Sequence, residues 1–224
     1  MKVFVFSVLI GFISGLYLFK KDIHRITFKS EKIKSKINNL TEDELKYFKD
    51  ITLKNELNEE IKELPHKYRE DIKIFVHGDY DQNMIKEVKT VVDDLNDIIN
   101  PIDLYFVNNR SQSNMIVYFG NYENFINHHS GIEPHRIIKN SDGFFLNNSN
   151  SKTGTIKSSV IFINLANNQC VLDTRDAIRE EITQALGFYN DTWDYPNSCF
   201  YQGGNHILNY SDIDLKLINH LYND

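Results

Sequence analysis

Four polar residues near position 180 have the types and spacing that could do chemistry. They are Glu180, Glu181, Thr183 and Gln184, in the run E-E-I-T-Q. On a helix Glu180 and Gln184 would share one face, because residues four apart lie one above the other, with Glu181 on the flank. Two neighbouring carboxyl groups in a cleft can act as general acid and base, or bind a cation. On an outer helix face the same side chains would only contact water.

This run also fits the frame of a zinc-peptidase helix. Such helices carry H-E-x-x-H, and one branch adds a glycine and a third ligand after a turn. On that frame Glu180 and Gln184 stand where the two histidines would be. Glu181 takes the place of the catalytic glutamate, and Gly187 that of the glycine. Zinc prefers imidazole and thiolate, so a carboxylate and an amide predict a much weaker zinc site, better suited to a hard cation.

The residues around this run resemble those of a known bacterial family. They are R-E-E-I-T-Q-A-L-G-F-Y-N-D-T at 179–192, Trp193, Y-P-N-S at 195–198, F-Y at 200–201 and a closing helix at 215–222. The family is the domain of unknown function number 2927, an exported group that looks like a diverged zincin, or zinc-peptidase-like, fold. Its own pattern has E-E-x-T-Q in place of H-E-x-x-H. The resemblance implies an α+β, zincin-like mixed sheet and export, but no reaction.

Three functions fit these residues. The first is a zincin-like binding or interaction module without zinc-peptidase activity, which would bind a peptide or protein through Glu180, Gln184, Asn190 and Asp191. The second is a hydrolase with Glu181 as general base, with or without a divalent cation held by Glu180, Gln184 and Asp191. The third is a structural protein in which the run only maintains the fold. No cofactor is predicted, although a divalent metal could bind.

A helix at about 174–187 must position these residues. Asp173 or Thr174 is the predicted N-cap, and Gly187 is the predicted stop because glycine tolerates the left-handed conformation that ends many helices. An apolar stripe with helical spacing should face the core. It comprises Ile178, Ile182, Ala185 and Leu186.

Hydrophobic patterns predict the other elements of an α+β domain. Alternating or continuous apolar runs predict strands at 72–76, 102–107, 114–118, 142–146 and 158–165. Helical spacing predicts helices at 83–99 and 215–222, the second capped by Ser211. The strands and helices in this order indicate a sheet with helices packed on it.

The N-terminal region predicts a membrane anchor or signal segment at 1–20. Residues 3–19 form an apolar run without an A-x-A-like cleavage site, which favours an uncleaved anchor. Lys20, Lys21 and Arg25 favour a cytoplasmic domain by the positive-inside rule, whereas the family resemblance implies a periplasmic or extracellular one, which we favour. A charged helical spacer is predicted at 21–70 and the zincin-like domain at 71–224.

The composition restricts the partners. The net charge is −6 and the pI is about 5.8, which argues against nucleic acid because nucleic-acid binding normally needs a basic face. A hydrophobic content of 41% can form a sizeable core. The expected partners are therefore the membrane, through the N-terminal segment, and a peptide or protein ligand.

Two cysteines lie on either side of the predicted helix. Cys170 precedes it and Cys199 follows its loop, and the chain has no others. In an oxidising compartment they could form a disulfide. As the alternative, each could be a buried thiol that packs as a small apolar side chain.

Overall fold

The computed structural model describes residues 40–54, 61–129, 139–168, 170–203 and 206–223. They belong to a compact unit that runs from Asn39 to Asp224. The predicted membrane segment at 1–20 and residues 21–39 of the predicted spacer lie outside the described ranges. Within those ranges no helix has the length and apolar character needed to cross a membrane.

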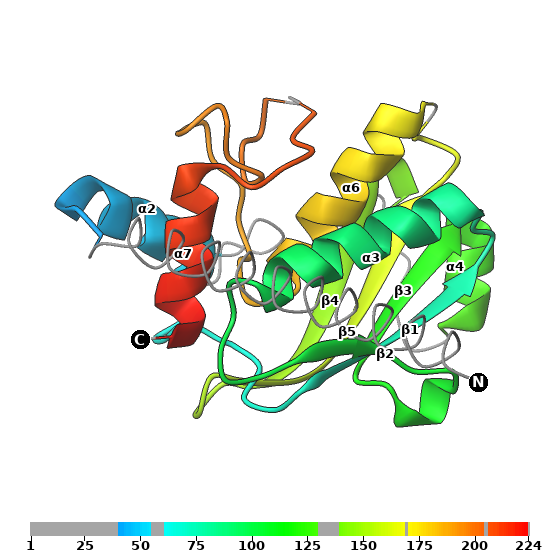
Figure 1. Cartoon of the computed structure of the whole chain (residues 1–224), viewed down its shortest axis with the longest axis horizontal. Coiled ribbons are helices and arrows are strands. Elements are labelled where there is room, and N and C mark those ends of the chain that lie inside the picture. The colour runs from blue at the N-terminus through cyan, green and yellow to red at the C-terminus, as the bar shows by residue number, and fades with distance from the viewer. Residues whose placement is uncertain (1–39, 55–60, 130–138, 169, 204–205, 224) are drawn as a thin grey trace, which may run out of the picture. The chain divides into compact units, whose positions relative to one another are not determined.

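A five-stranded mixed sheet forms the centre of this unit (Figure 1). Its strands are β1 Ile72–Gly78, β2 Leu104–Phe106, β3 Met115–Gly120, β4 Gly143–Asn150 and β5 Thr155–Asn164. The order is β2-β1-β3-β5-β4. Four strands are parallel, and β4 pairs antiparallel with β5 in a register that places Leu146 opposite Val160. As a result β4 lies at one edge of the sheet and β2 at the other.

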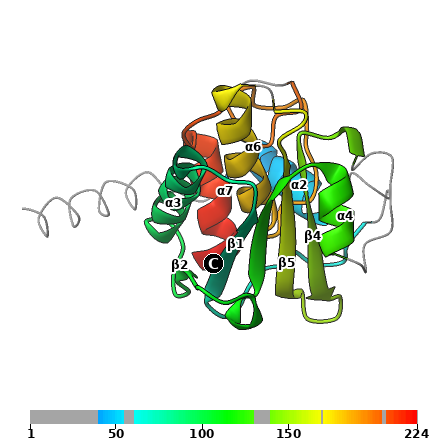
Figure 2. The ribbon, with the colours of Figure 1, turned by 90° about the vertical axis from the view of Figure 1, so that its right-hand side faces the viewer.

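Helices cover both faces of the sheet (Figure 2). Two of them, α3 Gln82–Asn96 and α6 Val171–Gln184, pack against each other on one face. The short α4 Tyr122–His128 lies on the other face. The last helix, α7 Asp212–Asn223, contacts α2 Glu42–Leu53 through an ion pair of Lys216 with Glu44. This arrangement confirms the α+β prediction and each predicted strand.

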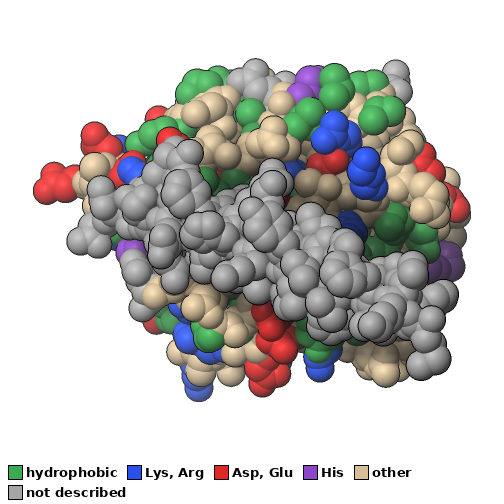
Figure 3. All heavy atoms as spheres, viewed as in Figure 1, with side chains coloured by type: hydrophobic (Ala, Val, Ile, Leu, Met, Phe, Trp, Pro, Cys, Tyr) green, Lys and Arg blue, Asp and Glu red, His purple; other side chains and the backbone are tan. Residues whose placement is uncertain are grey.

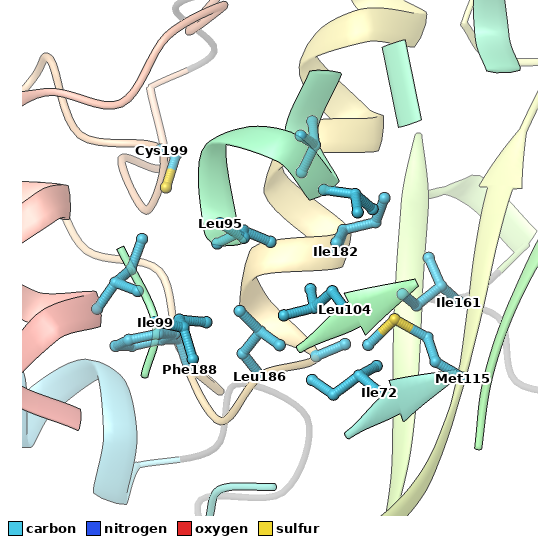
Figure 4. Packing of buried hydrophobic residues seen from close by; sticks show 14 of the residues in the cluster. Ile72, Leu95, Ile99, Leu104, Met115, Ile161, Ile182, Leu186, Phe188 and Cys199 are labelled. Carbon is cyan, nitrogen blue, oxygen red and sulfur yellow. The ribbon is translucent and has the colours of Figure 1, made fainter. Parts of the chain in front are cut away.

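The main hydrophobic core lies between the sheet and the helices α3 and α6 (Figure 4). The predicted stripe of α6 is fully buried there: Ile178, Ile182, Ala185 and Leu186 have no exposed surface. Burying each large aliphatic side chain contributes roughly 1.5–3 kcal/mol relative to exposure. A smaller aromatic cluster fills the space under α4. It comprises Tyr118, Phe125, Phe144 and Phe162.

The domain begins earlier than the sequence predicts. We expected a spacer up to residue 70, yet Tyr47, Phe48 and Ile51 of α2 are buried in the main core. The Tyr47 hydroxyl also donates to Ser198 Oγ at 2.9 Å. The predicted spacer is helical here, as expected, but its amphipathic helix α2 is part of the domain.

Both ends of α6 lie about three residues earlier than the sequence predicts. The N-cap is Cys170, three residues before Asp173, which is instead the third residue of a capping box and accepts from the Cys170 backbone N–H at 3.1 Å. The helix ends at Gln184 with Ala185 as C-cap, so the predicted stop Gly187 lies in the turn that follows the helix. The φ of Gly187 is 129°, and a Cβ there would overlap the carbonyl oxygen of His66.

Exposed apolar side chains gather away from the core, over the start of α6 and the loop that follows this helix. This surface forms the upper edge of the space-filling view (Figure 3). The large exposed residues in these segments are Val171, Leu172 and Trp193. None of the three lines the cavity described next.

Candidate functional site

A cavity of about 860 Å³ lies between β4 and α6. Five consecutive residues of β4, Gly143 to Asn147, line one side of it, together with Ser149. Successive side chains of a strand point to opposite faces, so a cavity that touches all of them runs along the edge of the strand. In the described part of the sheet β4 pairs only with β5, so β4 is an edge strand, and its residues line this cavity.

Two of the predicted site residues, Glu180 and Asp191, line the opposite wall, and Gln184 lies against both without lining the cavity. The Gln184 amide Nε2 donates to Asp191 Oδ1 at 2.5 Å and lies 3.5 Å from Glu180 Oε1. Glu180 and Gln184 are one turn apart on α6, and Asp191 is brought back by the turn at Gly187. The spacing predicted this grouping correctly. The spacing did not predict that Gln184 is buried, because the expected helix face was one in contact with water.

The carboxyl groups in this wall affect one another. Burial raises the pKa of Glu180 well above its ordinary value of 4.5, and the negative charges of Asp191, Glu181 and Asp176 raise it further. Burial also raises the pKa of Asp176 above 3.8. A protonated Glu180, or a cation placed beside it, would relieve this repulsion.

Glu181 lies close to the start of β4. Its side chain is buried and lines the cavity. A Cβ added to Gly143 would lie 2.7 Å from Glu181 Cγ and 2.8 Å from Oε1. Only glycine at position 143 therefore leaves room for Glu181 in this position.

Asn190 does not join the group. Its side-chain amide donates to the carbonyl oxygen of Asp50 at 3.4 Å, so it points toward α2 and away from the cavity. It helps to hold the loop after α6, and the structure gives it no place among the binding residues.

The donor set does not suit zinc. Across the described ranges, no three His, Cys, Asp or Glu side chains converge in a way that could hold a metal. Gln184 presents its amide nitrogen to Asp191 and Glu180, whereas a metal would need its carbonyl oxygen. The residues that stand where zinc-peptidase histidines would be are thus engaged with each other.

The far end of the cavity contains residues that no sequence motif indicates. Ser149 Oγ lies 2.9 Å from Nδ1 of the buried His66, and the Lys62 ammonium lies 3.4 Å from the centre of the Tyr189 ring. Asn147 connects this end of the cavity to the C-terminal end of α6. Its side-chain amide donates to the carbonyl oxygen of the C-cap Ala185 and to the Tyr189 hydroxyl, each at 3.1 Å. Burial raises the pKa of Tyr189 to about 12, so its hydroxyl keeps its proton.

Of the two alternatives for the cysteines, the disulfide is not formed. Cys170 is exposed at the N-cap of α6, while Cys199 is buried, and both are free thiols. Cys199 lies near Arg179 and Asp214.

One family matches the chain over most of its length. The family model described as a protein of unknown function (DUF2927) matches residues 41–224. The match begins at Thr41, the N-cap of α2, and so includes the helix that the sequence analysis placed in a spacer. No curated protein matches the chain.

Proposed function

The chain belongs to the DUF2927 family, and from the geometry of the cavity we propose that it is a binding module for polypeptides. An extended segment of the partner would lie along β4 and form main-chain hydrogen bonds with its outer edge. The single observation that carries this proposal is that an edge strand lines a cavity of about 860 Å³. Edge strands are templates for added strands, and main-chain hydrogen bonds supply the affinity in such complexes.

The dimensions suit a short extended segment. β4 has eight residues, which span about 26 Å at ~3.3 Å per residue. The volume lies within the range of roughly 300–1,000 Å³ that is usual for ligand pockets. We therefore expect the cavity to hold about six to eight residues of the partner.

The carboxyl groups of Glu180, Glu181 and Asp191 give one end of the cavity a preference for positive charge. A lysine or arginine side chain, or an amino terminus, placed there would relieve the repulsion that raises the pKa of Glu180. Gln184 would hold Asp191 in place for this contact.

We further propose a zincin-like scaffold that lacks peptidase chemistry. The mixed sheet with α6 on one face, and the run E-E-I-T-Q on that helix, support this proposal. Zinc lowers the pKa of its bound water to about 7, and without imidazole ligands for zinc Glu181 would have no such water to deprotonate. Purified protein that cleaves peptides only with added zinc would overturn it.

Export and anchoring by residues 1–20 remain part of the proposal. The apolar run at 3–19 and the family resemblance support a domain outside the cytoplasm. Protease added to spheroplasts, from which the outer layers are removed, should then digest the domain, and full protection until the cytoplasmic membrane is lysed would contradict this location.

A hydrolase with Glu181 as general base is the second candidate. The raised pKa of Glu180 favours it, because a protonated and an ionised carboxyl group side by side can divide the acid and base roles. In that case the protein cleaves peptides and Glu181→Gln abolishes cleavage. Under the binding proposal, both proteins leave the peptides intact.

The binding proposal is tested by retention of peptides on the immobilised full chain. We expect it to retain members of a random eight-residue peptide library, identified by mass spectrometry. Gly143→Val should reduce retention at least about tenfold, because its side chain enters the space between β4 and Glu181.

The matched control is Asn148→Val, which adds a similar side chain to an exposed position of β4 outside the cavity lining. It should bind as the wild type does. No retained peptide, or equal retention by wild type and Gly143→Val, would contradict the proposal.

A further inference from the structure

We propose that the end of the cavity opposite Glu181 binds a carboxylate, namely the free C-terminal carboxylate of the bound peptide. This inference rests on the proposed function, because it assumes a peptide along β4. It assigns a ligand group to Lys62, His66, Ser149 and Lys152, which all line that end of the cavity.

These four side chains offer hydrogen-bond donors and positive charge. The Lys62 ammonium lies on the ring of Tyr189, 3.4 Å from its centre, and its nitrogen is buried there although the rest of the side chain is half-buried. Ser149 Oγ and His66 Nδ1 are 2.9 Å apart. If the serine hydroxyl donates to Nδ1, the Nε2–H of His66 can donate to a ligand. If His66 donates from Nδ1, the serine hydroxyl can donate to the ligand instead. Lysine and hydroxyl donors are the usual partners of a carboxylate.

The two ends of the cavity have opposite charge. Gly143, beside Glu181, and Ser149, beside His66, are six residues apart on β4, or about 20 Å at ~3.3 Å per residue. The Debye length at physiological ionic strength is only about 8 Å, so each end attracts its own ligand group without much influence from the other. Glu63 is the acidic residue at the basic end, and it is exposed.

This polarity sets the direction of the ligand. A peptide with its carboxylate near Ser149 and its amino end near Glu181 runs parallel to β4. About six residues separate the two ends, so the ligand class is a short peptide with a free C-terminus, or the C-terminal tail of a protein.

The test compares two random eight-residue peptide libraries on the immobilised full chain. The libraries are identical except that one ends in a free carboxylate and the other in an amide. We expect the free-acid library to be retained at least about tenfold more, because a hydrogen bond to a charged group is stronger than one to a neutral amide.

Lys62→Met is the informative variant, since methionine keeps the apolar contact with Tyr189 and removes the charge. It should retain both libraries equally, at the level of the amide library on the wild type. Lys157→Met, which removes the same charge from an exposed position of β5 outside the cavity lining, should keep the tenfold preference. Thermal unfolding checks that both variants are folded.

Three results would overturn this inference. Equal retention of both libraries by the wild type would reject the carboxylate site and leave peptide binding intact. Retention that follows internal Asp or Glu residues, whatever the C-terminus, would assign the site to a side chain. Retention of neither library would reject the proposed function as well, which distinguishes the two failures.

Discussion

At Glu180, burial and the charges of neighbouring carboxyl groups act in the same direction. Burial is the largest cause of its raised pKa, followed by Asp191, Glu181 and Asp176. A carboxyl group whose pKa is raised by folding stabilises the folded state below its unfolded pKa, near 4.5. This contribution is lost as the pH rises through the folded pKa. The raised pKa of Glu180 therefore makes the free protein less stable at neutral pH than it is near pH 4.5.

Replacing Glu180 by glutamine should increase stability in a pH-dependent way. We expect Glu180→Gln to raise the free energy of unfolding at pH 8, and the gain should shrink toward pH 4.5, where wild-type Glu180 is protonated. Urea unfolding at the two pH values measures this difference. Glu70→Gln, at an exposed position, is the control. An equal gain at both pH values would contradict the assignment.

At the residue scale the sequence predicted one wall of the cavity and missed the other. Glu180 and Gln184 are one helical turn apart, and a glycine turn brings Asp191 back, so spacing was sufficient. His66 and Ser149 are 83 residues apart and belong to no motif. Only the packing of the chain brings them together. Spacing also could not predict that this face of α6 is buried beside a cavity and not exposed to water.

At the element scale, α6 is fixed to α3 by a buried cation. The Arg179 side chain has no exposed surface, and its Nη2 lies 3.0 Å from Asp94 Oδ2 and 3.8 Å from Glu87 Oε1. The guanidinium also lies on the ring of Tyr210, 4.5 Å from its centre. A buried charge is costly unless it is paired, so these contacts fix the position of α6 relative to α3.

Removal of this cation should be strongly destabilising. We expect Arg179→Ala to cost about 3 kcal/mol of unfolding free energy, because it leaves Asp94 and the Tyr210 ring without their buried partner. Arg175→Ala should cost about 1 kcal/mol, since Arg175 also pairs with Glu87 but its side chain is 37% exposed. Chemical denaturation measures both. If the two variants lost the same unfolding free energy, burial of Arg179 would not increase its contribution to stability.

The elements themselves were largely predictable, because each strand has a run of apolar residues and Gly187, with a positive φ, marks the turn just after α6. The start of α6 was wrong by three residues. Its cap is a cysteine whose Sγ accepts from the Asp173 N–H at 3.4 Å, and cysteine is not among the usual N-cap residues. N-cap preferences therefore favour Asp173 over Cys170 as the start of the helix.

At the scale of the whole molecule, the described domain is larger than the sequence indicated. α2 supplies Tyr47 to a buried network in which Ser198 Oγ donates to Asp214 Oδ1 at 2.6 Å. This network joins α2, the loop after α6 and α7, so α2 is needed to hold the loop that carries Asp191. The sequence predicted the helix but not its partners, since those are about 150 residues away.

The central claim is that a peptide adds to the edge of β4. The most direct measurement is amide hydrogen exchange of the full chain, with and without the library peptide that is retained most strongly. We predict slower exchange at residues 143–149 when the peptide is bound, because outward amides of β4 gain hydrogen bonds. The other edge strand, β2 at 104–106, should be unchanged. Unchanged exchange in β4, or protection confined to β2, would contradict the account.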